Sequence, residues 1–353
     1  GSTPRMIQQW RRENNLKMTL IGCDSHLYAD NSGAYVDVAP ADFVGLNTST
    51  GAGYGSVTYG TQAYGTARTG TTNLTAFREA WSMANWGEDM LAVASSDGRL
   101  FHYDSSLPST DVTVVGVYAI STISRTSNVT TIVTTTAHNL TTSDTVKISG
   151  VTDSTFNVAS TSVTVTNSTT FTYSNSGTDG SSSGGKVQDL SVPTSNRAVI
   201  VTPERHAMLI GAGGSMRRVA WSSREDFTDW NFASTTNTAG FLDLQSETPL
   251  VTACAVREGT LIWSVNRAFL MRYIGLPFIY GADELGTTKL YSPSSYAEFD
   301  GRAVWMDESG FMVYGGGSMQ PMQCPLSDYI FSDIDPEYGP RVAHASVNGK
   351  FDE

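Results

Sequence analysis

The stretch that decides the fold is Leu261-Ile262-Trp263-Ser264-Val265-Asn266-Arg267-Ala268-Phe269, in which a polar break separates two apolar runs. This pattern is typical of a β-hairpin, because turn-forming residues divide two strand-like segments. Trp221, Trp263 and Trp305 are spaced 42 residues apart, and each is followed six positions later by Phe. A period of about 40–45 residues is that of one four-stranded propeller blade. The spacing therefore predicts successive copies of one blade, with each tryptophan packed inside its own copy.

Two upstream segments follow the same template with a small residue in place of Trp. Residues 91–101 and residues 19–28 each contain an apolar run, a polar turn and a second apolar run. One period beyond Trp305 lies Val347, followed by Asn348-Gly349, a dipeptide that favours a two-residue hairpin turn. Because a single blade leaves apolar faces uncovered, we expect the blades to stack side by side around an axis. An ordinary β-sandwich is the alternative that the spacing leaves open.

Residues 110–189 differ in character from the rest of the chain. Thr, Ser and Val dominate there, in short alternating runs such as residues 129–134, which predict a small β-barrel or β-sandwich. We interpret the Gly- and Ser-rich tract at 177–185 as a flexible return to the host domain. The fold expected is all-β, a β-propeller-like array of antiparallel hairpins in residues 1–109 and 190–353 with this small domain inserted. The insert either contacts a neighbouring subunit, the capsid side or a cell surface, or is a passive spacer.

Composition limits the classes of function. The chain has 34 acidic and 22 basic residues and a net charge of −12, and an anionic surface repels nucleic-acid phosphate. The apolar runs are too short to span a membrane. Cys23, Cys254 and Cys324 lie far apart, which is typical of buried thiols in a reducing cytoplasm and not of a disulfide or zinc framework. Because the chain starts at Gly1 without Met and stops at Glu353 after a turn signal, we expect it to be a fragment.

The sequence offers few residues for chemistry. Asp24-Ser25-His26 contains the residue types of a catalytic triad, but neighbouring side chains in a hairpin turn point apart. Five histidines stand singly, without a partner at ligand spacing: His26, His102, His138, His206 and His344. We therefore predict no catalytic residues and no metal-binding residues.

Three further patterns each have a simpler structural explanation. Residues 210–214 resemble a dinucleotide-binding loop, but Met216 stands at the third glycine position and a strand-like run follows, so we expect a turn and no cofactor. The Gly- and Tyr-rich residues 51–70 have no phosphate-loop lysine and form either an interaction surface or a disordered connection. The carboxylates that cluster in sequence favour acidic turns over a glycosidase pair: Asp226, Asp229 and Asp243, and Asp333, Asp335 and Glu337.

Several motifs resemble tail proteins encoded by short-tailed bacteriophages and prophages. They are Trp86-Gly87-Glu88-Asp89 and residues 195–199, 221–230, 271–278 and 323–331. The insert, from residue 137 to residue 153, is similar to a small β module found in phage tail and fibre proteins. The resemblance covers most of the chain outside the insert and carries no catalytic motif.

What the resemblance implies is a role like that of the tail nozzle, or tubular tail protein, of podoviruses, which carries a β-propeller and forms a ring around the DNA exit channel. We expect a non-enzymatic structural protein of the virion tail, made in the host cytoplasm, that forms a homo-oligomeric ring. It would contact other tail proteins, such as the adaptor and fibres, and let DNA pass without sequence-specific binding or membrane insertion. Acidic walls would repel the DNA backbone. The alternatives are a module that binds host glycan receptors through Tyr and Trp surfaces, and a propeller-type glycan hydrolase or lyase.

Overall fold

Five small sheets make up most of the structure, a computed structural model that describes residues 4–31, 33–43, 45, 80–336 and 339–347. Each of the five is a four-stranded antiparallel sheet whose strands follow one another in the chain. A sixth, larger sheet lies between the second and third of them in sequence. The expected all-β propeller with an inserted β domain is therefore confirmed, and we call the five small sheets blades 1 to 5.

The blades use consecutive strands. Blade 1 contains β1 (Pro4–Arg11), β2 (Lys17–Cys23), β3 (Leu27–Asn31) and β4 (Ala34–Asp37). Blade 2 contains β5 (Trp81–Trp86), β6 (Asp89–Ala94), β7 (Leu100–Tyr103) and β8 (Thr113–Val114). Blade 3 contains β17 (Ala198–Val201), β18 (Ala207–Ile210), β19 (Arg218–Trp221) and β20 (Gly240–Asp243). Blade 4 contains β21 (Leu250–Val256), β22 (Gly259–Ser264), β23 (Arg267–Gly275) and β24 (Ile279–Thr287). Blade 5 contains β25 (Tyr296–Phe299), β26 (Arg302–Asp307), β27 (Gly310–Gly315) and β28 (Ser318–Met322).

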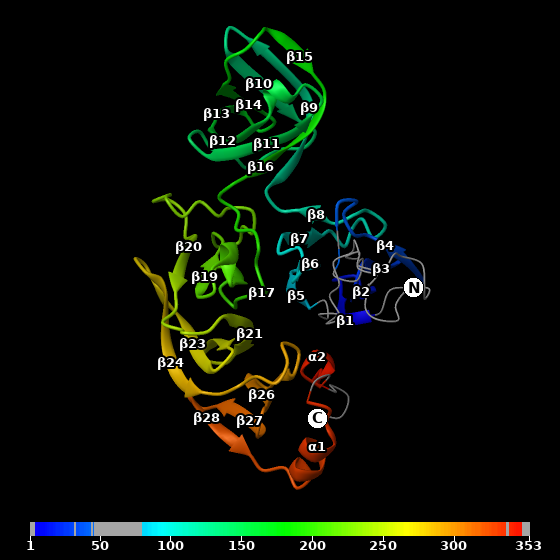
Figure 1. Cartoon of the computed structure of the whole chain (residues 1–353), viewed down its shortest axis with the longest axis vertical. Coiled ribbons are helices and arrows are strands. Elements are labelled where there is room, and N and C mark those ends of the chain that lie inside the picture. Colours follow the sequence, from blue (N-terminus) through cyan, green and yellow to red (C-terminus); the bar gives the residue numbers. More distant parts are fainter. Residues whose placement is uncertain (1–3, 32, 44, 46–79, 337–338, 348–353) are drawn as a thin grey trace, which may run out of the picture.

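The first strand of each blade faces the axis of the propeller. β5 contacts β1 and β17, β17 contacts β21, and β21 contacts β25. Figure 1 shows the blades following one another around this axis, with the insert extending from one side. The second strands of blades 2, 3 and 4 are enclosed on both faces by the neighbouring blades: residues 90–94 of β6, 207–210 of β18 and 260–264 of β22 are buried throughout. Such continuous apolar runs are what a fully enclosed strand requires.

The tryptophan repeat holds for two of its three members. Trp263 on β22 and Trp305 on β26 occupy the second strand of consecutive blades, but Trp221 lies on β19, the third strand of blade 3. The prediction of three equivalent positions is wrong for Trp221 because a long loop, residues 222–239, separates β19 from β20 and lengthens blade 3. The counterpart hairpin in blade 3 is β18–β19, and its turn contains residues 211–214.

The turn at residues 211–214 is the one that superficially matches a dinucleotide loop. Gly211, Gly213 and Gly214 adopt positive φ angles of 65°, 66° and 75°, a region that glycine occupies without the steric cost that a Cβ brings. The chain then enters strand β19, so no helix N-terminus follows this turn. Residues 19–28 and 91–101 form the β2–β3 and β6–β7 hairpins.

The insert is built from β9 (Val117–Thr126), β10 (Val129–Thr134), β11 (Thr145–Val151), β12 (Val158–Ser162), β13 (Thr164–Asn167), β14 (Thr170–Ser174), β15 (Gly180–Ser182) and β16 (Gly184–Asp189), with a short 3-10 turn at Ser154–Phe156. The strand order is β12-β11-β16-β9-β10-β14-β13, and β15 also pairs with β9. Long strand β9 is shared by the two halves, which enclose one apolar core around Ile132, Phe156 and Phe171.

Two details of the insert differ from expectation. Its first strand begins at Val117 and not near residue 110, because Thr113–Val114 forms the outer strand of blade 2. The Gly- and Ser-rich tract is not a flexible return: Gly180–Ser182 pairs with β9 and Gly184–Asp189 pairs with β11 and β9. Small side chains are compatible with a strand where neighbouring strands supply the backbone hydrogen bonds, one neighbour for Gly180–Ser182 and two for Gly184–Asp189.

The chain after blade 5 turns to short helices. α1 (Ser327–Asp333) and α2 (Gly339–Val342) follow β28 and lie on the side where the last blade faces the first (Figure 1). Val347 lies outside any strand, and the Asn348-Gly349 turn signal lies outside the described residues, as do residues 51–70. In the part of the chain that the structure describes, no helix has the length and apolar character needed to cross a bilayer.

Candidate functional site

A central cavity of about 620 Å³ lies where the five first strands meet. Its lining includes residues 6–8 of β1, 81–85 of β5, 199–201 of β17, 252–255 of β21 and 296–298 of β25, together with residues 344–347 near the C-terminal end. The backbone N–H of Ala345 donates a hydrogen bond to the carbonyl of Ser294 at 2.8 Å. The hub of the propeller is thus partly filled by the chain's own C-terminal segment.

The walls of this cavity carry little charge. Glu298 is the carboxylate among the lining residues, and His344 is the titratable base. Loss of hydration inside the cavity raises the pKa of the Glu298 carboxyl. The volume is in the range of small-molecule sites.

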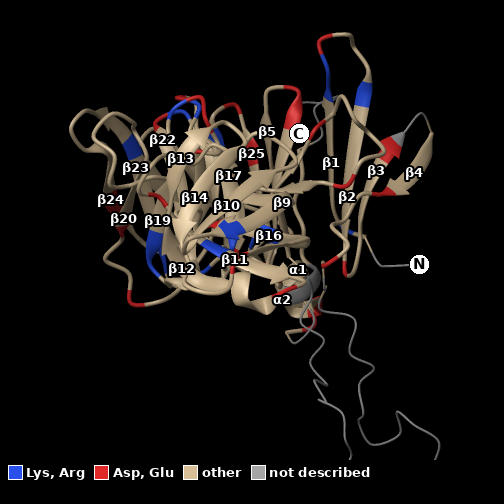
Figure 2. Cartoon of the chain, turned by 90° about the horizontal axis from the view of Figure 1, so that it is seen from above, with Lys and Arg blue, Asp and Glu red and all other residues tan. Residues whose placement is uncertain are grey.

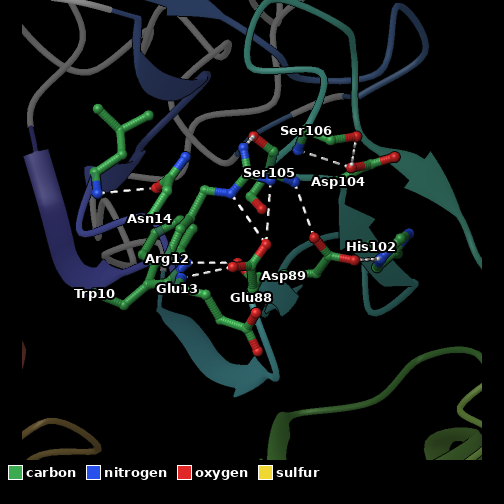
Figure 3. A network of polar contacts seen from close by, with 11 residues as sticks. Trp10, Arg12, Glu13, Asn14, Glu88, Asp89, His102, Asp104, Ser105 and Ser106 are labelled. Carbon is green, nitrogen blue, oxygen red and sulfur yellow. Dashed lines mark hydrogen bonds and ion pairs between the residues drawn. The ribbon is translucent and has the colours of Figure 1, made fainter.

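A polar network joins blade 1 to blade 2 at the end of the β1–β2 hairpin (Figure 3). The Trp10 Nε1–H donates to the Glu88 carbonyl at 2.6 Å, and Arg12 Nε donates to Glu88 Oε2 at 3.1 Å. The backbone N–H of Glu13 donates to Glu88 Oε1 at 2.6 Å, and this bond and the Arg12 pair lower the pKa of the Glu88 carboxyl. Glu88, in the turn between β5 and β6, therefore fixes the neighbouring blade.

On the side of blade 3, contacts are made by Trp86 and Asp89, which flank this turn, and by His102 of the neighbouring strand β7. His102 Nε2 lies 3.1 Å from Asp89 Oδ2, and its ring lies 4.6 Å from that of Phe227 in the long loop of blade 3. The Arg205 guanidinium is 4.4 Å from the centre of the Trp86 ring. The Trp-Gly-Glu-Asp motif is thus a joint that contacts three consecutive blades.

Asn196 forms a second joint. Its buried side-chain amide donates to the carbonyls of Gly98 at 2.8 Å and Pro193 at 2.7 Å, and its Oδ1 accepts from the N–H of Gly213 at 3.3 Å. These bonds tie the turn of blade 2 to the turn of blade 3. Next to it, Arg197 Nη1 donates to the carbonyl of Leu250 at 3.3 Å, where blade 4 begins.

The histidines and the triad-like tripeptide do not converge. His26 Nδ1 pairs with Asp37 Oδ2 at 2.6 Å, whereas Asp24 Oδ2 accepts from Arg5 Nη2 at 2.7 Å, so the two ends of the tripeptide have different partners. His206 donates from Nδ1 to the Ser222 carbonyl, 2.8 Å away, inside blade 3. His138 is buried in the insert, and His344 lies at the hub. Among the described residues no group of three or more His, Cys, Asp and Glu side chains is placed to hold a metal ion.

The carboxylates that cluster in sequence satisfy local donors. Asp229 accepts both from the backbone of Asn231 and from the Asn237 amide, and Asp243 forms a two-point ion pair with Arg218 at 2.8–2.9 Å. Asp226 caps its own turn through Thr228. In the second group Asp333 ends α1, Asp335 accepts from Gly339 through its carbonyl, and Glu337 lies outside the described residues.

The aromatic and thiol side chains are mostly interior. All seven tryptophans are buried, none with more than 9% of its surface exposed, so a glycan-binding face would have to be built from tyrosines. Cys23 and Cys254 are buried and Cys324 is partly exposed, and all three are free thiols. Burial raises the pKa of the Cys254 thiol well above its usual value, which makes it inert.

Two exposed apolar features were not predicted from the sequence. The β23–β24 hairpin ends in an apolar tip, which we define as Ile274, Leu276 and Phe278, and the chain after blade 5 presents a C-terminal patch, defined as Met322, Leu326 and Tyr329. The signal for the first was available: residues 273–280 form an uncharged apolar run across a turn, where polar residues are the rule.

Charge is scattered over the molecule. Figure 2 shows Lys and Arg interspersed with Asp and Glu, on a ribbon that for the most part carries neither. Many of these charges form exposed pairs, such as Arg272 with Asp283 and Lys289 with Glu308. We find no broad basic face to attract nucleic acid among the described residues, in keeping with the net charge of −12.

No protein-family model and no curated protein matches the chain. Solved structures with a similar arrangement include the extracellular domain of the putative one component system BT4673 from B. thetaiotaomicron, with 10% identity, a TM-score of 0.34 and 92% of this chain covered. The chain spans 34% of the length of that protein. Apo AztD from Citrobacter koseri has 10% identity and a TM-score of 0.32, with 89% of this chain and 84% of AztD covered. BBS1N in complex with ARL6DN has 11% identity and a TM-score of 0.33, with 92% of this chain and 81% of BBS1N covered.

Proposed function

We propose that this chain is a structural component of a bacteriophage tail, part of a ring or nozzle around the DNA exit channel. One observation carries the proposal: three of the five stretches that resemble tail proteins of short-tailed phages, residues 86–89, 195–199 and 221–230, lie at joints between blades. Glu88 binds Arg12 of blade 1, Asn196 binds Gly98 of blade 2, and Phe227 packs on Trp86. In a DNA conduit, such contacts between blades would make the wall rigid.

The arrangement also favours a non-enzymatic role. The carboxylates considered for glycan cleavage serve as acceptors for Asn237, Thr228 and Arg218. The acidic balance of the surface disfavours tight binding of DNA and keeps a passing duplex free to slide. The partners that this role implies are further copies of the chain and other tail proteins.

Labelling of the virion tests the proposal. A gold or fluorescent-protein tag on this chain is expected at the tail in electron micrographs of particles, and the purified full-length protein is expected to form rings. A tag found only inside the capsid, or on no particle at all, would contradict the tail role.

Single substitutions distinguish the proposed structural role from the enzymatic alternative. Asp229→Asn and Asp243→Asn variants should leave phage infectivity unchanged once the variant protein is shown to fold, because the hydrogen bonds of each side chain lie within its own loop or sheet. Loss of infectivity together with loss of envelope-degrading activity, in a variant with normal unfolding, would favour a hydrolase or lyase.

A further inference from the structure

The most exposed apolar side chains of the described residues fall in only two places. Leu276 and Phe278 expose 78% and 73% of their surface, and Tyr329 and Leu326 expose 70% and 62%. The first two belong to the apolar tip of blade 4, and the other two belong to the C-terminal patch. Contiguous exposed apolar groups on a soluble protein usually mark an interaction site.

The apolar tip is supported by aromatic packing at its base, around Tyr280. Tyr280, two residues after Phe278, is buried with its hydroxyl 2.9 Å from that of Thr202, and its ring is 5.0 Å from the Trp221 ring. Tyr273 packs on Tyr280 at 5.7 Å from the opposite strand. The tip is therefore a projection whose geometry is fixed before any partner arrives, and such preorganisation lowers the entropic cost of binding.

The C-terminal patch is supported less extensively than the tip. Phe331 of α1 packs against Phe311 of β27 at 5.7 Å, while Tyr329 on the same helix is exposed. None of the residues of α1 is buried, although the helix is short and needs packing to persist. An apolar partner that covers Leu326 and Tyr329 would supply the missing contacts.

The charges beside the two features are complementary. Arg272 lies near the tip, in a pair at 2.9 Å with an exposed Asp283 that contributes little to stability. The patch carries Asp328 in the first turn of α1 and Asp333 at its end, and α1 has no basic residue in its last turn. Arg272 can therefore exchange its present partner for a carboxylate beside the patch.

We propose that the apolar tip of one copy of this chain docks on the C-terminal patch of the next copy. The tip and the patch belong to different blades, and Figure 1 places β24 and α1 on different sides of the propeller, so the contact is head to tail. Repetition of a head-to-tail contact produces a ring when the rotation closes. The inference rests on the proposed ring assembly and names the surfaces that build it. A lipid bilayer is the less favoured occupant, because the acidic patch would face acidic headgroups.

Site-directed cross-linking tests the pairing. In a full-length chain with Cys324→Ser, the double variant Leu276→Cys and Tyr329→Cys should give a ladder of oxidised multimers ending in one closed species. Each single variant should give no multimers. A dimer from Leu276→Cys alone would show a tip-to-tip contact and overturn the proposal.

Charge substitutions provide the quantitative test. Leu276→Asp and Tyr329→Asp should each weaken assembly by about 30-fold or more in mass photometry, as expected for interface hot spots. Tyr35→Asp, at a residue of blade 1 that is also exposed, should leave assembly unchanged. Rings that persist in both variants overturn this inference while leaving the tail role intact. A wild-type chain that stays monomeric, or that binds liposomes through the tip, also overturns it. A tag absent from the tail contradicts the proposed function instead.

Discussion

Trp263 and Trp305 lie against each other across the boundary between blades 4 and 5, with ring centroids 5.4 Å apart and planes at 69°. Both are buried, and Tyr296 packs on Trp263 from the first strand of blade 5 at 5.1 Å. Aromatic pairs in this edge-to-face arrangement add to the energy of their burial. The equivalent placement of two indoles in consecutive blades thus serves to bind those blades together.

The two indoles differ in their polar contacts, so we expect them to contribute differently to the free energy of unfolding. Trp305 Nε1 donates to Thr288 Oγ1 at 2.8 Å, whereas Trp263 Nε1 has no hydrogen-bond partner among the described residues. We expect Trp305→Phe to lower the free energy of unfolding by about 1 kcal/mol more than Trp263→Phe. Urea denaturation followed by tyrosine fluorescence and circular dichroism measures both, and equal losses would contradict the assignment.

Gly98 should resist substitution for a steric reason. It has a φ angle of +71°, and a Cβ placed there would lie 2.4 Å from the Cα of Ser195. Gly98→Ala is expected to cost at least about 2 kcal/mol, of which the left-handed conformation alone accounts for about 1. Gly316, with a φ angle of +64° and open space around it, is the matched control. Gly316→Ala should show the conformational cost alone, so similar losses in the two variants would argue against a tight joint.

Asp189 is expected to destabilise the chain at neutral pH. Burial raises the pKa of its carboxyl, and the nearby charges of Asp144 and Asp229 act in the same direction. A raised folded-state pKa means that this group favours folding below the pKa of the unfolded chain and loses that contribution as the pH rises. Asp189→Asn, which keeps an acceptor for the Ser191 N–H, should raise the free energy of unfolding by about 1 kcal/mol at pH 7. The gain should vanish near pH 4 in the same denaturation assay, and a loss at pH 7 would refute the assignment.

His206 should make blade 3 sensitive to acid. Burial lowers the pKa of its imidazole, so the unfolded chain binds a proton more readily, and stability falls as the pH drops below the usual histidine pKa of about 6.5. The slope due to this residue is at most about 1.4 kcal/mol per pH unit. His206→Gln should flatten the dependence of unfolding free energy on pH between 6.5 and 5. An unchanged slope in His206→Gln would contradict a buried neutral imidazole.

The sequence was informative wherever one residue pattern corresponds to one strand. The hairpins at residues 19–28 and 91–101 and the blade core around Trp263 follow directly from apolar runs broken by turns, because a strand enclosed on both faces must be apolar throughout. The prediction placed Trp221 in the wrong strand, because an interval measured in residues does not reveal how many strands it contains. A long loop in blade 3 restored the 42-residue interval while shifting the residue to the third strand.

The joints could not be predicted in the same way. Glu88 and Arg12 are 76 residues apart, and Asn196 and Gly98 are 98 residues apart, so no local pattern signals that they meet. The pairing of Gly180–Ser182 with β9 was hidden by composition, because Gly and Ser are as common in flexible linkers as in this strand. The apolar tip was visible in the sequence as an uncharged run, but its exposure depends on how far the β23–β24 hairpin extends past its neighbours.

Every blade is completed by its own four consecutive strands, and in the described residues no strand of blade 5 pairs with a strand of blade 1. Blades 1 and 2, 2 and 3, 3 and 4, and 4 and 5 are instead joined by buried apolar clusters that draw residues from both blades. Among the described residues no such cluster joins blade 5 to blade 1, where the segment around Ala345 binds the carbonyl of Ser294. The boundary between the first and last blades can therefore open without exposing a shared apolar core, unlike the other four.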